Sequence, residues 1–481
     1  MANKIYSIPE LGNIKLEGHL INPDAKIDKV KYGVVALGQG GGKLSIEFNR
    51  VGHYVSLFNT AQEDLTNAEL TLKKIGNTNY KITRFSGFDG AKKDRSIGLK
   101  AVHENIEILQ NNLVEDENLK KADFIWVAAA FGGGTGSGSV TDVVRIVSNL
   151  IRDGHSRIGY EEDENENIIS EGKPTVGVIA MIPDDSSGHR VKLNAAEALQ
   201  ELVELQNDGT LGSILLVDNE KLMQEALRND KSKLKWHEQG NASVLSLITE
   251  VTVTSSLPSD ESFDKSELLD IFSEPGFLSF SKYSFNTRLK DDLDTIVNSS
   301  TESSVFTDGY NLSEAIISAL LIIKNKKSTL LNSHDELMIR TKMSEKLSNV
   351  RYLHYGIYDV NTTQDYETAI RNIGKHSYQE KEKVIIYSLS ILKNPPKRII
   401  EMIESALLKR QQAEASFSES RSKLSDFNLT QKSEVKKKSA KSLQTLLSQK
   451  NKKPTNLVTA SESTNETFAK NVSSILELKT R

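Results

Sequence analysis

Short apolar runs alternate with amphipathic stretches along the first half of the chain. Residues 32–37 form the first apolar run, residues 44–51 carry apolar side chains at near-helical spacing, and residues 54–58 form a second run that ends at Asn59. This order predicts a strand, a helix and a parallel strand, because a crossover helix joins parallel neighbours. The pattern therefore favours an α/β fold.

The alternation continues and predicts a doubly wound parallel sheet. The further predicted elements of this part are helices around 97–114 and 140–150 and strands at 124–128, 176–181 and 213–217. Between them, the acidic segment Glu161–Glu166 is expected to be a solvated surface loop, since loops are usually polar and lie on the surface.

The second half predicts a connecting helix at 240–256 and then a smaller α+β domain. Its predicted elements are strands near 276–282, 350–358 and 383–392, a helix at 311–325 and, after Pro395-Pro396, a helix at 397–412. From about Glu414 the chain is rich in Ser, Lys, Gln and Asn, so we expect the end of the chain to be mobile or to fold on binding.

Composition narrows the class of protein without identifying it. The 481 residues include 61 Lys and Arg against 65 Asp and Glu, so the global charge does not indicate a nucleic-acid-binding protein. The absence of cysteine excludes disulfides, thiolate nucleophiles and cysteine-based zinc sites. No signal-like run opens the chain, and no stretch approaches the roughly 20 apolar residues that span a bilayer. We expect a cytoplasmic protein without membrane contact.

A glycine-rich segment, residues 131–138, lies between a predicted strand and a predicted helix and reads FGGGTGSG. Without side chains, successive backbone amides can turn toward one anion, and the helix N-terminus adds its dipole. Thr135 and Ser137 can add hydroxyl donors. A flexible turn is the alternative, but flexible linkers do not normally join a strand to a helix in this way. The segment predicts a di- or triphosphate site.

Two other nucleotide motifs fit the first glycine cluster, residues 38–42, poorly. A P-loop needs Ser or Thr after its Gly-Lys pair, whereas Gly42-Lys43 is followed by Leu44. A dinucleotide fingerprint needs a third glycine, but Lys43 stands at that position. It also needs an acid about 20 residues further on, but the second strand ends in Asn59. Walker-type ATPases and NAD-dependent oxidoreductases are therefore disfavoured.

The GGGTGSG run at 132–138 resembles the signature of the tubulin/FtsZ superfamily, and other segments resemble this family in the same order over residues 30–390. Residues 38–42 resemble its initial phosphate loop, with Lys43 where FtsZ usually has Asn. Residues 59–62, Asn-Thr-Ala-Gln, are similar to the FtsZ loop NTDAQ with its Asp replaced. The nearest resemblance is to the plasmid- and phage-encoded TubZ branch.

This resemblance implies a GTP/GDP site with magnesium held through phosphates and water. Residues 87–91 lie where the family closes over the γ-phosphate, residues 182–190 where it contacts ribose, and residues 216–222 resemble its IPNDKL segment. Asn219 is then the guanine-reading candidate and Asn241 a second one, because an amide offers both donor and acceptor. A turn residue and a helix cap are the alternatives. The expected nucleotide-binding residues are Gly38, Gln39, Gly40, Gly41, Gly42, Lys43, Asn59, Thr60, Gly90, Gly132, Gly133, Gly134, Thr135, Gly136, Ser137, Asp184, Arg190, Asn219 and Asn241.

Residues 262–267 resemble the FtsZ motif NxDxxD, in which Asp264 and Glu267 match the two acids and Ser262 replaces the Asn. Their spacing places both carboxylates on one face of a helix start, where either can polarise a water. The alternative is an acid at a helix N-terminus that is merely stabilised by the helix dipole. In the family these acids lie opposite the phosphate loops, so the resemblance implies GTP hydrolysis completed by the next subunit of a head-to-tail homopolymer.

The expected cellular role is movement of plasmid or phage DNA by dynamic filaments, as in the TubZ branch. Eight lysines between Lys432 and Lys453 meet only Glu434 as an acid, so this tail can attract a DNA-binding adaptor protein, although a solvated tail without a partner is an equal alternative. Two other functions remain open. One is an FtsZ-like division protein, although residues Ile475–Arg481 do not resemble the terminal peptide that FtsZ proteins usually carry. The other is a nucleotide-bound structural filament.

The expected domain organisation follows from these assignments. It comprises an N-terminal extension (1–30), a GTP-binding domain (31–238), a connecting helix (239–258), a GTPase-activating domain (259–395), a C-terminal helix (396–413) and a flexible lysine-rich tail (414–481).

Overall fold

The structure is a computed structural model of the chain. It describes residues 30–152, 158–162, 168–228, 235–255, 259, 262–286, 293–302, 304–325, 328–360 and 384–431. The chain divides into two units, residues 1–412 and 413–481. The first unit contains all of the sheet and every site discussed below.

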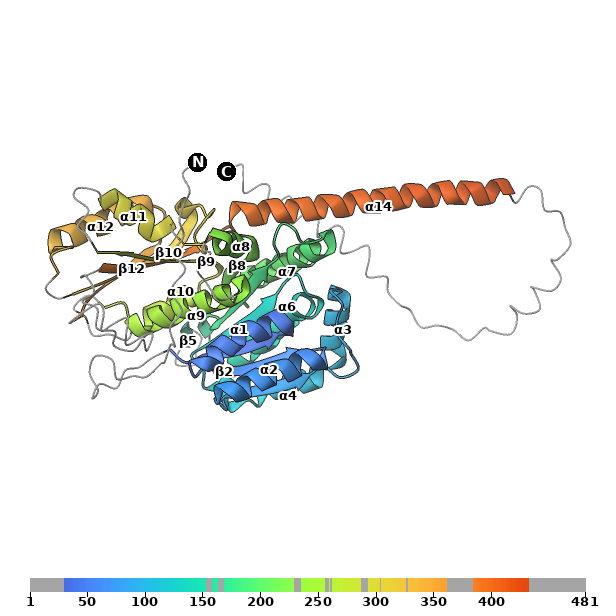
Figure 1. The fold of residues 1–481 in the computed structure, drawn as a ribbon, viewed down its shortest axis with the longest axis horizontal. Helices are drawn as coiled ribbons and strands as arrows, with labels where there is room; N and C mark the ends of the chain where they lie inside the picture. The colour runs from blue at the N-terminus through green and yellow to red at the C-terminus, as the bar shows by residue number, and fades with distance from the viewer. Residues whose placement is uncertain are drawn as a thin grey trace. The chain divides into compact units, whose positions relative to one another are not determined.

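One ten-stranded sheet is found within the described part of the first unit (Figure 1). In spatial order its strands are β11 (Tyr352–Val360), β10 (Ala315–Asn325), β12 (Val384–Leu392), β9 (Gly276–Phe285), β8 (Ser213–Asp218), β7 (Val176–Ile182), β4 (Phe124–Ala130), β1 (Tyr32–Leu37), β2 (Tyr54–Asn59) and β3 (Tyr80–Arg84). The strands from β9 to β3 pair in parallel, whereas β12 is antiparallel to both of its neighbours and β10 is parallel to β11. The predicted doubly wound parallel sheet is confirmed.

Helices cover both faces of this sheet, because alternate strand residues point to opposite sides and both sides are apolar. Val34 and Ala36 face one core, and Val35 and Leu37 face the other. The first face carries α1 (Gly38–Arg50), α2 (Gln62–Ile75), α8 (Asn219–Arg228), α9 (Trp236–Thr254) and α10 (Lys265–Ser273). The second carries α3 (Arg95–Glu104), α4 (Ile106–Val114), α5 (Glu117–Lys120), α6 (Gly134–Arg152), α7 (His189–Asn207), α11 (Leu293–Glu302), α12 (Ser333–Lys346) and the start of α14 (Lys397–Gln431).

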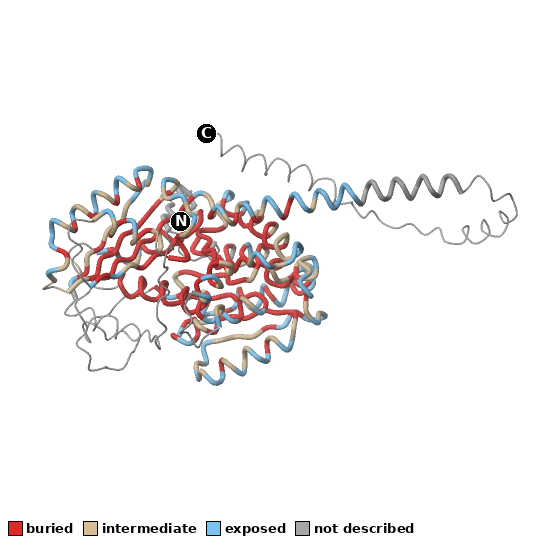
Figure 2. Tube along the Cα trace, turned by 45° about the horizontal axis from the view of Figure 1, so that its top comes forward, coloured by how far each residue is buried: buried red, intermediate tan, exposed pale blue. Residues whose placement is uncertain are grey.

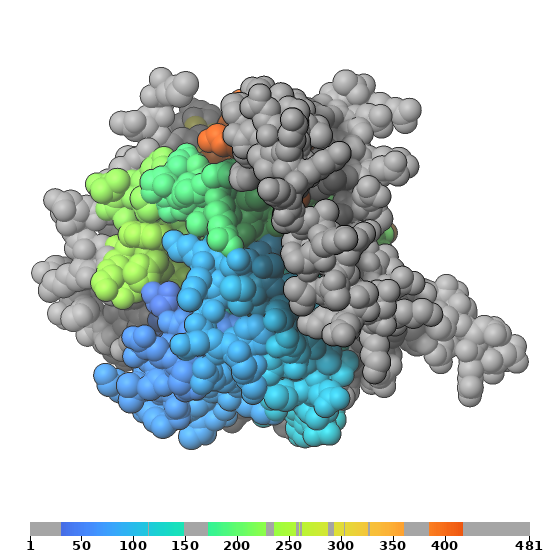
Figure 3. Space-filling model, turned by 90° about the vertical axis from the view of Figure 1, so that its right-hand side faces the viewer, coloured from blue at the N-terminus to red at the C-terminus, as the bar shows by residue number. Residues whose placement is uncertain are grey.

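Helix α9 joins the two halves of the unit, and all of its residues from Gln239 to Thr254 are buried. Figure 2 shows the buried residues in red in the interior of the molecule. Its Glu250 carboxylate is only 1% exposed, pairs with Lys282 of β9 at 2.8 Å and accepts from the Tyr387 hydroxyl of β12 at 2.5 Å. A buried charge of this kind is tolerated because it is paired and hydrogen-bonded. The predicted connecting helix therefore lies inside a core that both halves share. In the space-filling view the surfaces of the N-terminal segments, in blue, and of later segments, in green, adjoin on one face (Figure 3).

The predicted helix at 311–325 is wrong. After a short 3-10 turn, η1 (Leu312–Glu314), residues Ala315–Asn325 form strand β10, which pairs with β11 on one side and β12 on the other. The segment AIISALLII is apolar at almost every position, so its periodicity does not distinguish a buried helix from a buried strand. Its β-branched isoleucines and two neighbouring strands decide for the strand.

Two further predictions need correction. The single helix expected at 97–114 is split into α3 and α4 at Asn105, whose buried side-chain amide bonds both the backbone nitrogen and oxygen of Ser86, at 2.7 and 3.1 Å. The acidic loop expected at 161–166 begins inside a strand, because β5 (Ile158–Glu162) pairs with β6 (Ile168–Lys173) as an antiparallel hairpin. Residues 163–167 lie outside the described part of the chain.

Helix α14 begins after Pro395-Pro396, as predicted, and continues to Gln431. Residues 414–431, the first part of the expected tail, are therefore helical. The lysine-rich segment that starts at Lys432, and residues 1–29, lie outside the described residues.

Candidate functional site

A cavity of about 450 Å³ opens at the carboxyl edge of the parallel sheet, where β1, β2, β4, β7 and β8 end. Here β1 leads on one side to β2 and on the other side to β4, so the strand order reverses at this point. Ligands of doubly wound sheets bind at such a switch point, and the volume is that of an ordinary small-molecule site.

Two helices begin at one wall of this cavity. Helix α1 starts at Gly38, which adopts a left-handed φ of 68°, and its N-cap residue Leu37 supplies no capping side chain. Helix α6 starts at Gly134, where a Cβ atom would lie 2.6 Å from the carbonyl oxygen of Asp94. Glycine is thus required for the loop before α3 to close against the glycine-rich turn. Both helix N-termini direct backbone amides and a positive dipole toward the cavity, which suits an anion.

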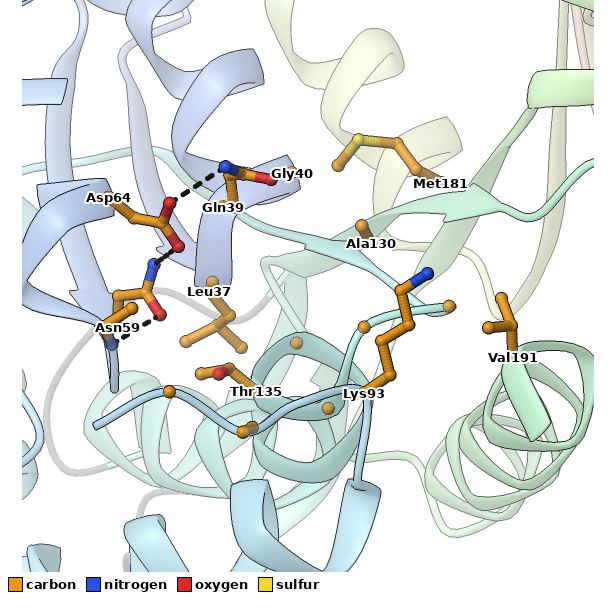
Figure 4. A pocket seen from close by; sticks show the side chains of 18 of the residues that line it. Leu37, Gln39, Gly40, Asn59, Asp64, Lys93, Ala130, Thr135, Met181 and Val191 are labelled. Atoms are coloured by element: carbon orange, nitrogen blue, oxygen red, sulfur yellow. Dashed lines mark hydrogen bonds between the residues drawn. The ribbon is translucent and has the colours of Figure 1, made fainter. Parts of the chain in front are cut away.

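Asp64 organises the side of the cavity nearest β2. Its carboxylate accepts from Gln39 Nε2 at 2.9 Å and from Asn59 Nδ2 at 3.1 Å, so one acid on α2 holds two amide side chains, one from the start of α1 and one from the end of β2 (Figure 4). The Thr60 and Thr135 hydroxyls meet at 2.8 Å in the same region. This wall is therefore built from polar groups whose orientation is already set.

Lys93 supplies a cation to the opposite side, where its side chain extends into the cavity (Figure 4). Lys92 and Lys93 both adopt left-handed backbone conformations, with φ of 49° and 59°. Such residues cost about 1–3 kcal/mol each and are concentrated at functional sites. Asn194 of α7 holds the turn by donating to the Lys93 carbonyl at 3.0 Å.

The far end of the cavity lies between the loop after β7 and the start of α8. Asn219 lines this end together with Asp184 and Ser187. Burial raises the pKa of Asp184, but hydrogen bonds from the hydroxyls of Ser186 and Ser187 lower it more, so its pKa lies below the ordinary value. The carboxylate is therefore charged and held in its own loop.

Most of the predicted nucleotide-binding residues line this cavity. They are Gly38, Gln39, Gly40, Asn59, Thr60, Gly90, Gly132, Gly133, Gly134, Thr135, Gly136, Asp184 and Asn219. They come from six loops spread over more than 180 positions of sequence, and the fold brings them to one edge of the sheet.

The remaining six do not line it. Gly41 packs against the backbone of β4, while Gly42 and Lys43 line an adjoining hollow of about 310 Å³ between α1 and α2. Arg190 pairs with Asp94, and Asn241 is buried in α9. The Ser137 hydroxyl turns back to the carbonyl of Gly133, as helical serines often do.

The two predicted catalytic acids lie at the start of α10, away from the cavity. Asp264 accepts from the amides of Ser266 and Glu267 at 2.8 and 3.0 Å, and Glu267 accepts in return from the amide of Asp264 at 2.9 Å. This is a reciprocal capping box. Burial raises the pKa of Asp264, but these bonds and the Ser266 hydroxyl lower it more. His354 of β11 also contacts Glu267, at 2.9 Å.

A salt bridge places the start of α10 at the amino edge of the sheet. Lys265 Nζ lies 3.1 Å from Oδ2 of Asp123, the residue that directly precedes β4. The glycine-rich turn follows the other end of the same strand. The seven residues of β4 span roughly 20 Å at 3.3 Å per residue, so the acids and the cavity lie at opposite edges.

Comparison with known proteins supports the resemblance found in the sequence. Residues 250–366 match the family model described as the C-terminal domain of the tubulin/FtsZ-like protein TubZ. The tubulin-like protein TubZ of Bacillus cereus is 25% identical over 428 residues, which cover 84% of this chain and 85% of that protein. These likenesses support a place for the chain in the tubulin/FtsZ superfamily, near TubZ.

Solved structures of TubZ and CetZ show the same fold as this chain. A GTPγS-form protofilament of TubZ from Bacillus thuringiensis serovar israelensis superposes with a TM-score of 0.58 at 18% identity, covering 80% of this chain and 94% of that one. CetZ from Methanosaeta thermophila gives 0.57 at 18% identity, covering 84% and 98%. Both likenesses concern the fold.

Sequence reasoning missed several residues at the cavity. Asp64 stands in the first turn of the helix that follows β2, so an acid at that place was a signal available in the sequence. Lys93 was not recognisable, because its left-handed conformation and its position depend on Asn194 and Gly134, far along the chain. Met181, Pro183 and Val191 complete the wall at the Asn219 end. None of the helices in the described residues is long and apolar enough to span a bilayer.

Proposed function

We propose that this protein binds and hydrolyses GTP and that a neighbouring subunit of a head-to-tail polymer completes its active site. One observation carries the proposal. The glycine-lined cavity lies at the carboxyl edge of the sheet and the acid pair at the amino edge, with β4 between them. A subunit cannot bring its own Asp264 to its own cavity, whereas stacking two subunits edge to edge brings the two together.

The chemical groups at the two ends of the cavity favour one orientation of a bound nucleoside triphosphate. Its glycine end offers the amides of residues 132–136, two helix N-termini and the ammonium of Lys93, which together would hold the phosphates. Its Asn219 end offers an amide that can both donate to and accept from guanine. The loop of Asp184 lies beside it and would contact the ribose.

Magnesium fits this cavity as an ion held mainly by phosphates and water. The ion prefers oxygen ligands and keeps several waters, and Asp64 offers a carboxylate on the cavity wall. Magnesium would neutralise charge on the phosphates, while Asp64 itself keeps Gln39 and Asn59 in place.

Hydrolysis needs a positioned water. In a polymer, Asp264 or Glu267 of one subunit would polarise a water beside the γ-phosphate of the next. The water oxygen bonds to phosphorus, the bond from phosphorus to the β–γ bridging oxygen breaks, and GDP leaves. Because the carboxylate and the phosphate belong to different subunits, the isolated subunit should hydrolyse GTP poorly.

Two further observations support the polymer. The relative from Bacillus thuringiensis carries the description of a GTPγS-form protofilament, and other structures of that protein are described as two-stranded and four-stranded filaments. In this chain we propose that residues 31–238 bind nucleotide and residues 259–395 supply the acids to the next subunit.

The cellular role that we propose is the partition of plasmid or phage DNA by cytoplasmic filaments. It rests on the resemblance to the TubZ branch and on the lysine-rich segment 432–453, which would bind a DNA-binding adaptor protein. That segment lies outside the described residues, so its deletion tests the role: filaments should still form, and adaptor binding at low salt should weaken.

A direct test measures binding and turnover of the purified protein. GTP should displace a fluorescent guanine nucleotide far better than ATP or NAD. Phosphate release per subunit should rise steeply with protein concentration, in parallel with sedimentable polymer. Equal displacement by ATP would refute the guanine site, and a rate per subunit that does not depend on concentration would refute completion by a neighbour.

A further inference from the structure

Arg398, the second residue of α14, contacts both sides of the Asn219 end of the cavity. Its Nε donates to Asp218 Oδ2 at 2.6 Å, and its Nη2 donates to the other Asp218 oxygen, so the pair is bidentate. Its Nη1 donates to Asp185 at 2.7 Å, and Nη2 also reaches the Pro183 carbonyl at 3.3 Å. Such a planar fork fixes orientation as well as charge.

The residues that accept hydrogen bonds from Arg398 line the cavity or lie next to residues that line it. Asp218 directly precedes Asn219 and accepts from the amide of Glu220 at 3.0 Å. Pro183 lines the cavity itself, and the amide of Asp185 donates to Glu220 at 3.0 Å. One guanidinium therefore closes a ring between the loop after β7 and the start of α8, on either side of the place where Asn219 stands.

Arg398 reaches this place because C-terminal elements hold it there. Lys397 donates its amide to the Gly309 carbonyl at 3.1 Å, and Lys221 of α8 pairs with Asp308 at 3.3 Å. The next residue, Ile399, is fully buried in the core of the second face. Arg398 itself lies 180 positions after Asp218 and 215 positions after Pro183.

The buried charge of Asp218 is compensated by Arg398. Its side chain is 5% exposed, while that of Arg398 is 19% exposed. The nearby Tyr310 hydroxyl has no hydrogen-bond partner among the described residues, and burial together with the Asp218 charge raises its pKa. Removing Arg398 would leave a nearly buried carboxylate with much less compensation, and such groups rearrange to reach water.

We propose that Arg398 is the positioning residue of the base-binding end, so that Asn219 takes its base-reading position only when the first turns of α14 lie on the sheet. This inference rests on the proposed nucleotide site. It makes affinity and base selectivity depend on the C-terminal helix, although no residue of that helix lines the described cavity.

Arg410 provides a matched control on the same helix. It pairs with Glu197 of α7 at 2.8 Å and does not touch the loops at the Asn219 end. Arg398→Gln removes the ion pairs with Asp218 and Asp185, and Arg410→Gln removes the ion pair with Glu197, so both variants weaken the docking of α14 on the body. A role in docking alone predicts the same behaviour for both variants, whereas a positioning role predicts a defect in Arg398→Gln only.

The first measurement is the affinity of the full chain for GDP, IDP and ADP. Inosine lacks the 2-amino group of guanine, so the GDP-to-IDP ratio reports the base contact. We expect Arg398→Gln to weaken GDP binding by about ten-fold and to bring that ratio toward one. Arg398→Lys, which keeps the charge and loses the fork, should fall between, and Arg410→Gln should match the parent. Equal loss in both glutamine variants, or an unchanged ratio in Arg398→Gln, would overturn the proposal.

The second measurement, amide hydrogen exchange without nucleotide, separates this proposal from the proposed function. Arg398→Gln should speed exchange in residues 183–191 and 217–222, while Arg410→Gln should leave both segments protected. If the parent binds no guanine nucleotide, the proposed function fails and this measurement still decides about Arg398. Unchanged protection in Arg398→Gln would show that Arg398 does not position these loops.

Discussion

Lys265 and Asp123 form an ion pair of 3.1 Å that fixes the first residue of α10 beside the residue preceding β4. The same Asp123 oxygen accepts from the backbone amide of Lys31, which precedes β1, at 2.7 Å. The start of α10 is therefore tied to the amino ends of the two central strands. Because the cavity lies at their carboxyl ends, the catalysis that we propose for Asp264 or Glu267 would require a second subunit.

Complementation between two inactive variants tests this requirement. Asp264→Asn keeps a good N-cap residue for α10 but removes the carboxylate, and Gly133→Asp places a negative charge on the phosphate wall at a position with room for a side chain. We expect each alone to release phosphate about 10²–10⁴-fold more slowly than the parent. Mixed, they should regain part of the rate, because the intact acid of one meets the intact cavity of the other.

The control for this mixture is a double variant that carries both substitutions. The double variant has neither an intact cavity nor an intact acid. When it is mixed with Asp264→Asn, no subunit carries the acid, so phosphate release should not recover. If Asp264→Asn alone turns over normally in polymer, Asp264 is only a helix cap, and Glu267 becomes the candidate to replace.

Lys93 should discriminate between nucleotides by phosphate number. Lys93→Gln removes the cation that extends into the glycine end of the cavity. We expect about ten-fold weaker binding of a slowly hydrolysed GTP analogue, and a smaller loss for GDP, because a charge-assisted bond to phosphate disappears. Titration of both nucleotides at fixed ionic strength measures this. Lys100→Gln, at an exposed position of α3 paired with Glu104, is the matched control, and equal losses in the two variants would remove Lys93 from the site.

Gly41 should be required for folding and not for a ligand contact. A Cβ atom there would lie 2.1 Å from the carbonyl oxygen of Ala128, whereas at Gly133 the nearest atom is 3.5 Å away. Gly41→Ala should cost about 1–3 kcal/mol, although alanine favours helices, because the backbone of α1 must move off β4. Gly133→Ala should change stability far less. Urea unfolding without nucleotide compares the two, and equal stabilities would contradict the close packing of α1.

The free energy of unfolding should decrease in acid, in part because His53 is buried in its neutral form. Its ring packs between Tyr32 and Phe48, its Nε2 has no partner among the described residues, and burial lowers its pKa to about 4. The unfolded chain takes up a proton near pH 6.5, and the folded chain does so only near pH 4. This group's contribution is therefore complete above about pH 6.5 and is lost as the pH falls toward 4.

Replacement of His53 isolates this effect. From pH 7.5 to pH 5 the contribution of His53 should decrease by about 2 kcal/mol, so the unfolding free energy of His53→Phe should fall less over this interval by about that amount. Parallel pH profiles of the parent and the variant would show that His53 is not the group responsible.

Local sequence determined the elements whose structure depends on nearby residues. The glycine run after β4 predicts a phosphate-binding turn because strand, glycines and helix follow one another directly. The sequence named all six glycines of residues 38–40 and 132–136 that line the cavity, and the threonine between them. A helix N-terminus at Asp264 was named from the sequence as the alternative to a catalytic acid, and in the structure this helix start is a capping box. Segment 311–325 failed because an all-apolar run carries no period, and its neighbours β11 and β12 decide its state.

The sequence alone therefore determined the resemblance to the tubulin/FtsZ superfamily, the parallel sheet and the glycine wall of the cavity, because each depends on short stretches of chain. Only the tertiary structure decided the rest. Asp64 holds Gln39 and Asn59, Asn194 holds the turn of Lys93, and Arg398 holds Asp218 from 180 positions away. The same is true of the distance between the acids and the cavity, which a single salt bridge and the length of β4 set. These relationships join residues far apart in sequence, and no local period or spacing records which side chains meet when the sheet closes.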